Sequence, residues 1–153
     1  MSELLDKVIS AAEEAGRIML SETDFTVEKK TSKENYVTSS DRIVEDMLRT
    51  RLPAILPGSG VMGEERGTTS GGSEYLWVVD PIDGTANYAR GFNASVCSIG
   101  LVHKGEVVLG VIRNPYTGET FWAEKGKGAF VNGKRIHVSD RDSSHSVVTT
   151  GWS

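Results

Sequence analysis

The chain has 153 residues, 38% of them apolar and 25% charged, which is enough for one compact domain with a core and argues against disorder. Its formal net charge of -4 and its scattered lysines favour a small-molecule partner and exclude a basic surface for nucleic acid. The N-terminal residues mix acids with apolar residues, so we expect no signal peptide, no membrane partner and a cytoplasmic location. With Cys97 as its one cysteine, the chain has no internal disulfide and no cysteine-based zinc cluster.

Two amphipathic helices are predicted in the first third of the chain. Within residues 3–20, apolar side chains recur every three or four positions, which is the period of one helix face. A second helix is expected to follow the cap-forming run Ser39-Ser40-Asp41 and to be ended by Pro53 and Pro57-Gly58. Its apolar stripe consists of Ile43, Val44, Met47 and Leu48.

The rest of the chain has the texture of short strands joined by tight turns. Turn dipeptides such as Thr117-Gly118 and Asn132-Gly133 separate consecutive apolar runs, which favours antiparallel pairing. Residues 67–75 are rich in Thr, Ser and Gly, and we expect them to form a flexible loop within one domain. The predicted strands are 76–79, 95–102, 107–112, 120–123 and 147–150.

Two helices followed by a meander of strands predict an α+β fold in which the N-terminal helices pack on one face of a mostly antiparallel sheet. Residues 1–153 then form a single domain. The opposite face of the sheet still needs a cover, and the chain stops soon after its last predicted strand without a closing helix. We take this as a first indication that a further part of the protein is missing.

The densest chemical signal is an apolar strand that runs into two carboxylates, Asp80 and Asp83, and then a glycine. Pro81 favours an extended conformation at Asp80, and Gly84 permits a tight turn, so both carboxylates can point to one side. Together with the carbonyl of Ile82, they offer hard oxygen ligands that suit Mg²⁺ and disfavour soft metals. If a helix begins after the glycine, the free N–H groups of its first turn would bind a phosphate.

A second apolar run also ends in carboxylates, at Glu64 and Glu65. A solvated loop charge is the commoner fate of such a pair, and Asp-Pro and Asp-Gly are ordinary turn dipeptides. If the runs 61–62 and 76–79 lie side by side in the fold, however, Glu64 joins the first two carboxylates. Two such endings in one small domain favour a metal site over two unrelated turns.

Other phosphate chemistries can be tested on the same residues. A haloacid dehalogenase-type phosphatase needs an aspartate nucleophile where this chain has Pro81, and an EF-hand needs a different acidic spacing. Residues 126–129 do not complete a P-loop, and there is no Gly-x-Ser-x-Gly elbow for a nucleophilic serine. Metal-activated water remains as the route to hydrolysis. The histidines are expected to lie on the surface: His103, His137 and His145.

Gly63-Glu64-Glu65 and residues 77–88, with the sequence WVVDPIDGTANY, resemble the paired signatures of the inositol monophosphatase family. Shorter matches extend the resemblance over nearly the whole chain: 37–41, 98–100, 126–129 and 132–133. Lys30 and Asp41 are softer matches, which fall where the family has a lysine and an aspartate near its metal site. The resemblance implies a Mg²⁺-dependent, lithium-sensitive hydrolase that acts on a small phosphorylated metabolite such as inositol monophosphate.

The resemblance also implies roles for single residues. Glu64 and Thr85 would orient the attacking water, and Asp83 would take part in catalysis while facing the alcohol part of the substrate. Gly84 and Thr85 would bind the phosphate through their backbone N–H groups. The metal ligands would be Glu64, Asp80, the carbonyl of Ile82 and Asp83.

Length is the main departure from the family pattern. The family fold is a five-layered αβαβα sandwich, and the part resembled here is only its N-terminal, metal-binding domain. The second domain supplies another aspartate to the metal site and most contacts to the inositol ring. Two hypotheses follow. The chain is an enzyme, or an enzyme fragment, that hydrolyses small phosphomonoesters, or it is a truncated or split half that binds metal and acts only when a homodimer or a complementary C-terminal half completes it.

Overall fold

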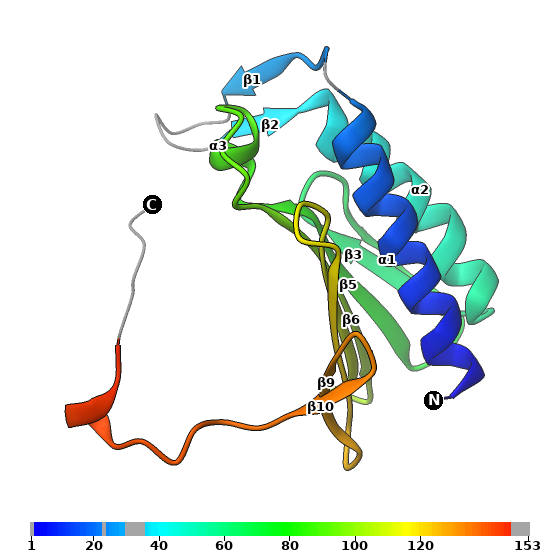
Figure 1. The fold of residues 1–153 in the computed structure, drawn as a ribbon. Helices are drawn as coiled ribbons and strands as arrows, with labels where there is room; N and C mark the ends of the chain where they lie inside the picture. Colours follow the sequence, from blue (N-terminus) through cyan, green and yellow to red (C-terminus); the bar gives the residue numbers. More distant parts are fainter. Residues whose placement is uncertain (1, 23, 30–35, 148–153) are drawn as a thin grey trace.

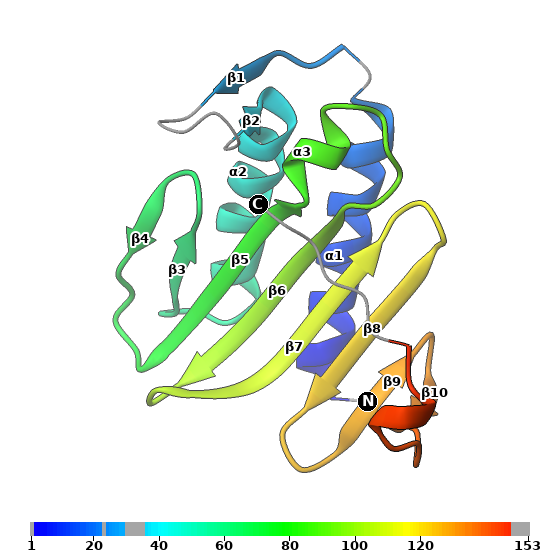
Figure 2. The ribbon, with the colours of Figure 1, turned by 90° about the vertical axis from the view of Figure 1, so that its left-hand side faces the viewer.

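The structure is a computed structural model that describes residues 2–22, 24–29 and 36–147. Two long helices lie on one face of an eight-stranded sheet, as Figures 1 and 2 show from two sides. The α+β fold and the mostly antiparallel sheet predicted from the sequence are therefore confirmed. The helices are α1 (Glu3–Ser21), α2 (Ser39–Ile55), the four-residue α3 (Thr85–Tyr88) and a 3-10 turn (Ser143–His145).

The main sheet has the strand order β10-β9-β8-β7-β6-β5-β3-β4. Neighbouring strands in it pair antiparallel, except that β3 and β5 run parallel. Its strands are β3 (Gly60–Gly63), β4 (Gly67–Thr69), β5 (Tyr75–Asp83), β6 (Val96–His103), β7 (Glu106–Asn114), β8 (Glu119–Glu124), β9 (Gly128–Val131) and β10 (Lys134–Ile136). A separate two-stranded sheet contains β1 (Val27–Lys29) and β2 (Tyr36–Thr38).

The core lies between the two helices and the sheet. Helix α1 packs over β6 and β7, and α2 packs over β3 and β5. Helix α1 buries most of the stripe that the 3.6-residue period predicts, and α2 buries Val44 and Leu48 of its predicted stripe. Alternate residues of the strands pack against these side chains. The fully or nearly fully buried side chains include Leu5, Val8, Ala12, Met19, Val44, Leu48, Leu52, Trp77, Ile99, Leu101 and Val111.

Helix α2 differs in three details from its predicted form. Its N-cap is Thr38, which forms a capping box with Asp41, so the helix begins one turn earlier than expected. Ile43, which was predicted to face the core, is 42% exposed, whereas the charged residue Glu45 is fully buried. Pro53 lies inside the helix, because a proline in the last turn forfeits only one backbone hydrogen bond.

The strand predictions were right for the centre of the sheet and incomplete at its edges. Residues 67–69 of the predicted loop form β4, and Tyr75 begins β5, so the loop between the strands is shorter than expected. Strands β1, β2, β9 and β10 are too short to give a clear sequence pattern. The predicted strand 147–150 falls mostly outside the described residues, and Val147 itself is not in a strand.

No long helix of the described residues covers the face of the sheet opposite α1 and α2; on that side the figures show the segment after β10 with its short 3-10 turn (Figures 1 and 2). Small residues on β6 to β9 leave a hollow of about 290 Å³ in this face, with Phe121 and Phe130 on its walls. Ile112, which borders the hollow, is 43% exposed. The described part of the chain therefore has the open apolar face that the sequence predicted. No helix among the described residues is long and apolar enough to cross a membrane.

Candidate active site

The parallel pairing of β3 with β5 brings the two acidic strand ends together. Gly63, the last residue of β3, pairs with Val79 of β5. The residues that follow this pair are Glu64 on one strand and Asp80 on the other. Because parallel strands end at the same edge of a sheet, both carboxylates lie at that edge. The sequence predicted that Glu64 joins the other carboxylates only if the runs 61–62 and 76–79 lie side by side. The structure shows that they do.

A bulge in β5 explains how Asp80 and Asp83 serve one site. Asp80 pairs with Ser98 and Asp83 pairs with Val96, so β5 has one residue more than β6 over this interval. Residues three apart on a regular strand point to opposite faces, and one inserted residue returns the second to the side of the first. Pro81 lacks an N–H group for the ladder, which makes this the natural position for the irregularity.

Asp80 is the most perturbed carboxylate of the group. Burial, and then the negative charges of Asp83, Glu64 and Asp41, raise its pKa from an ordinary 3.8 to about 7, against a hydrogen bond from the backbone of Ile82. Its Oδ1 atom is buried and has no hydrogen-bond partner. Asp80 thus combines the electrostatic influence of three other carboxylates with a buried oxygen that has no donor, which favours a bound cation.

Gly84 connects the bulged strand to α3 in a conformation that suits glycine. Its φ is +91°, and a Cβ atom there would lie 2.8 Å from the carbonyl oxygen of Ala94. The first hydrogen bonds of α3 are donated by Asn87 and Tyr88 to the Gly84 carbonyl, so the N–H groups of Thr85 and Ala86 precede them in the turn. The predicted helix start after Gly84 is confirmed, although α3 has only four residues.

Asp41 reaches the site from α2, a contact that the sequence suggested only weakly. It is 2% exposed, and its Oδ2 atom accepts hydrogen bonds from the backbone N and the Oγ1 of Thr38 at 2.8 and 2.5 Å. Its Oδ1 atom lies 3.0 Å from Oγ1 of Thr85, which is also 2.9 Å from the carbonyl oxygen of Ile82. Burial raises the pKa of Asp41, and these hydrogen bonds oppose that rise. The N-terminal cap of α2 therefore holds the side chain of Thr85.

Tyr88 anchors α3 and was not predicted to have this role. Its hydroxyl lies 2.9 Å from the carbonyl oxygen of Met19 and 3.2 Å from Oγ of Ser40, and its ring stacks on Phe25 at 4.8 Å. These contacts join α3 to the C-terminal end of α1 and to the first turn of α2. A large aromatic residue three positions after the Gly84-Thr85 turn was the only signal in the sequence.

The donor set fits a hard divalent cation, although it does not yet form a closed cage. In the parts of the chain that the structure describes, no three His, Cys, Asp or Glu side chains are close enough to hold a metal ion as they stand. The unpartnered Oδ1 of Asp80 nevertheless fits a hard cation, and oxygen donors of this kind suit Mg²⁺. The ligand roles of Glu64, Asp80, Ile82 and Asp83 stay predictions. Lys30 lies outside the described residues.

Comparison with known proteins identifies the family. The sequence profile described as the inositol monophosphatase family matches residues 1–153. The chain belongs to the inositol monophosphatase family. A family member from Aquifex aeolicus, named fructose-1,6-bisphosphatase/inositol-1-monophosphatase, is 38% identical over 95% of this chain and 57% of its own length.

Solved structures of the inositol monophosphatase fold agree with this assignment. The extragenic suppressor protein suhB from Bartonella henselae has a TM-score of 0.87 at 34% identity, over 92% of this chain and 56% of that one. An IMPase/NADP phosphatase, solved as a complex with Mg²⁺ and phosphate, has a TM-score of 0.72 at 25% identity, over 86% of this chain and 51% of that one. The chain spans about half the length of the relatives it matches.

Proposed function

We propose that this chain provides the metal-binding and phosphate-binding part of an active site that hydrolyses small phosphate monoesters with Mg²⁺, and that inositol monophosphate is a substrate. The observation that supports this most strongly is the meeting of Glu64, Asp80 and Asp83 at one sheet edge, with a buried Asp80 oxygen that has no partner. The Mg²⁺ and phosphate complex of one relative adds support for the cofactor.

The metal would be held by Glu64, Asp80, the Ile82 carbonyl and Asp83. Bound Mg²⁺ would neutralise charge on the phosphoryl oxygens and lower the pKa of the attacking water. The residues of this chain then have separate tasks. Backbone N–H groups of Gly84 and Thr85 bind the phosphate, and Asp83 faces the alcohol that leaves.

Thr85 is placed to orient the attacking water. When its hydroxyl donates to Asp41 at 3.0 Å, the lone pairs of Oγ1 are left to accept a hydrogen bond from water. Glu64, at the end of β3, accepts the proton as the water attacks. Asp41 holds the hydroxyl rotor in the required direction, because its other oxygen is fixed by Thr38.

The second candidate is a part that binds metal without catalysis and acts only with a complementary C-terminal half or a second copy. The open sheet face and the coverage of about half of each relative favour this alternative. Such a chain would still bind divalent metal at the same carboxylates. It would lack the remaining contacts to a sugar or inositol ring.

The two candidates separate in one experiment on the purified chain. Mg²⁺-dependent phosphate release from inositol 1-phosphate is measured beside Asp83→Asn, with and without Li⁺. Release that disappears in Asp83→Asn and falls with Li⁺ supports the enzyme. If a folded chain binds metal and releases no phosphate, the first candidate is wrong for this chain alone.

A further inference from the structure

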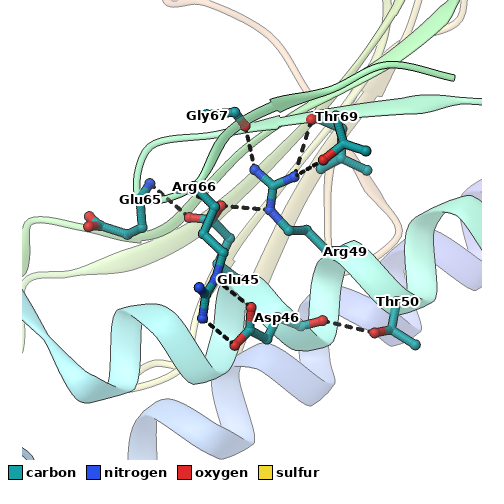
Figure 3. A network of polar contacts seen from close by, with 9 residues as sticks. Glu45, Asp46, Arg49, Thr50, Glu65, Arg66, Gly67 and Thr69 are labelled. Atoms are coloured by element: carbon teal, nitrogen blue, oxygen red, sulfur yellow. Dashed lines mark hydrogen bonds and ion pairs between the residues drawn. The ribbon is translucent and has the colours of Figure 1, made fainter.

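Glu45 is a fully buried carboxylate of α2 that contacts the backbone just after β3 (Figure 3). Its Oε2 atom accepts a hydrogen bond from the N–H of Glu65 at 2.9 Å, and its Oε1 atom accepts one from the N–H of Arg66 at 3.1 Å. Two successive peptide groups of the turn between β3 and β4 are thus bound by a single side chain. The residue before them is Glu64.

Arg49, one helical turn along α2, completes the arrangement. Its Nε donates to Oε1 of Glu45 at 2.8 Å, so the buried carboxylate has a counter-charge whose side chain is 13% exposed. Its Nη1 donates to Oγ1 of Thr69 at 2.9 Å, and its Nη2 donates to the carbonyl of Gly67. Both residues are on β4. Figure 3 shows the guanidinium of Arg49 between α2 and the β3–β4 hairpin. Arg49 thus binds β4, the strand that follows the turn, while Glu45 binds the turn itself.

Gly63 leaves the space that this contact needs. A Cβ atom at Gly63 would collide with the carboxylate of Glu45, so the helix and the strand end approach as closely as a glycine allows. Gly63 also pairs with Val79 of β5 and with Gly67 of β4. Its own position is therefore fixed from both sides of the strand.

These contacts fix the backbone on both sides of Glu64. The ladder holds Gly63 before it, and Glu45 holds the peptide group after it through the N–H of Glu65. Fixing the two flanking peptide planes sets the backbone angles of Glu64 and hence the direction of its Cα–Cβ bond. Glu64 follows Gly63, which pairs with Val79, so the residue that these contacts fix belongs to the sheet edge at which Asp80 also lies.

We propose that Glu45, supported by Arg49, is a positioning residue that aims the carboxylate of Glu64 at the metal site. The inference rests on the proposed function, because it acts through the ligand role given to Glu64. Burying an ion pair costs desolvation free energy, and apolar side chains of similar volume often stabilise a fold equally well or better. Stability alone is therefore a weak reason for this pair. What two charged hydrogen-bonding groups add is a defined orientation of the peptide groups that they bind.

A nearby ion pair supplies a matched control. Asp46, the next residue on α2, pairs with Arg66 of the same turn at 2.6 Å, but the two side chains are 54% and 48% exposed. This pair joins the same helix to the same turn through side chains only, without binding the backbone beside Glu64. An exposed pair of this kind contributes little.

The test measures binding of Mn²⁺, as a substitute for Mg²⁺, by the electron paramagnetic resonance signal of the free ion. Glu45→Gln should weaken Mn²⁺ binding about 10- to 100-fold, as loss of a group that orients a ligand typically does. Asp46→Asn should change binding by less than about threefold. Glu64→Gln should weaken binding strongly, and Glu45→Gln added to Glu64→Gln should have no further effect, because the first residue acts through the second.

The outcomes separate the inference from the function on which it rests. If Glu64→Gln weakens binding and Glu45→Gln does not, the positioning role is refuted and the ligand role stands. Additive losses in the double variant also refute the positioning role. If Glu64→Gln leaves binding unchanged, Glu64 is no ligand, and the proposed function loses a part of its site together with the inference.

Folding is checked for each variant by circular dichroism. If Glu45→Gln does not fold, Arg49→Lys takes its place, since lysine keeps the charge beside Glu45 but cannot bind Thr69 and the Gly67 carbonyl together. Weakened Mn²⁺ binding by folded Arg49→Lys supports the proposal, and unchanged binding opposes it. If neither variant folds, Glu45 and Arg49 are needed for the stability of the domain and not specifically for the orientation of Glu64, and the proposal is overturned.

Discussion

Gly84→Ala tests the junction between β5 and α3, on which the predicted phosphate-binding turn depends. Gly91 offers a matched control in the same region, because both glycines have positive φ, +91° and +68°. A Cβ atom at Gly91 would meet nothing within 4 Å, whereas one at Gly84 would lie 2.8 Å from the carbonyl oxygen of Ala94. The two variants share the strain of a left-handed alanine and differ in the collision.

The expected losses follow from this difference. An alanine in the left-handed region costs about 1–2 kcal/mol at either position. The collision at Gly84 should add about 1–3 kcal/mol, which is the usual cost of an extra methyl group in a filled space. The smaller entropy of an unfolded chain with alanine offsets part of both losses and cancels from their difference.

Urea denaturation of the three proteins measures these free energies of unfolding. To relieve the collision, the backbone at residues 84 and 94 must move, and this displaces the hydroxyl of Thr85. If the parent chain releases phosphate, the rate should therefore fall at least about 100-fold in Gly84→Ala. Gly91→Ala should keep most of the activity. Equal losses of stability in the two variants would refute the reasoning, because the contact with Ala94 would then have no energetic cost.

Three further predictions concern charge and exposure. In the metal-free protein, burial and neighbouring carboxylates raise the pKa of Asp80 to about 7. The folded state therefore binds this proton more tightly than the unfolded state does, so the urea midpoint should fall as the pH rises from about 4 to about 7 and then level off. Asp80→Asn should reduce that slope, and the raised pKa of Asp41 accounts for a remainder in the same direction. The open sheet face predicts self-association, which sedimentation velocity should detect and Ile112→Asp should reduce; a wild-type protein that stays monomeric at high concentration would contradict this. Burial raises the pKa of Cys97 to about 12, so iodoacetamide at about pH 8 should label it only after unfolding.

The part of the site that the sequence revealed is local. Asp80, Pro81, Asp83 and Gly84 lie within five residues, and proline and glycine have strong conformational effects, so the strand and the turn after it could be predicted together. The bulge that turns both carboxylates to one side follows from the missing N–H of the proline. The approach of Glu64 is different, because it depends on a parallel pairing that no local pattern specifies.

The residues that support this local segment come from α2, and there the sequence pattern was misleading. Ile43 fits the apolar stripe and is largely exposed, whereas Glu45 and Arg49 look like an ordinary surface pair at positions i and i+4. Only the position of the hairpin against the helix shows that this pair faces inward, to the backbone of the turn. Asp41 was similarly read as a cap residue and is also the partner of Thr85, 44 positions away.

Asp41 and Glu45, which bind two different turns of the site, are both residues of α2. A single helix therefore helps to bring together residues from the ends of separate strands and turns. Asp41 binds the hydroxyl of Thr85 in the turn after β5, and Glu45 binds the turn after β3 that begins with Glu64. The two residues are four positions apart on α2, so one rigid helix relates the two sides of the site to each other. Geometry that depends on a helix tolerates changes in the exposed loops between the strands, and it should fail when either buried carboxylate loses its charge.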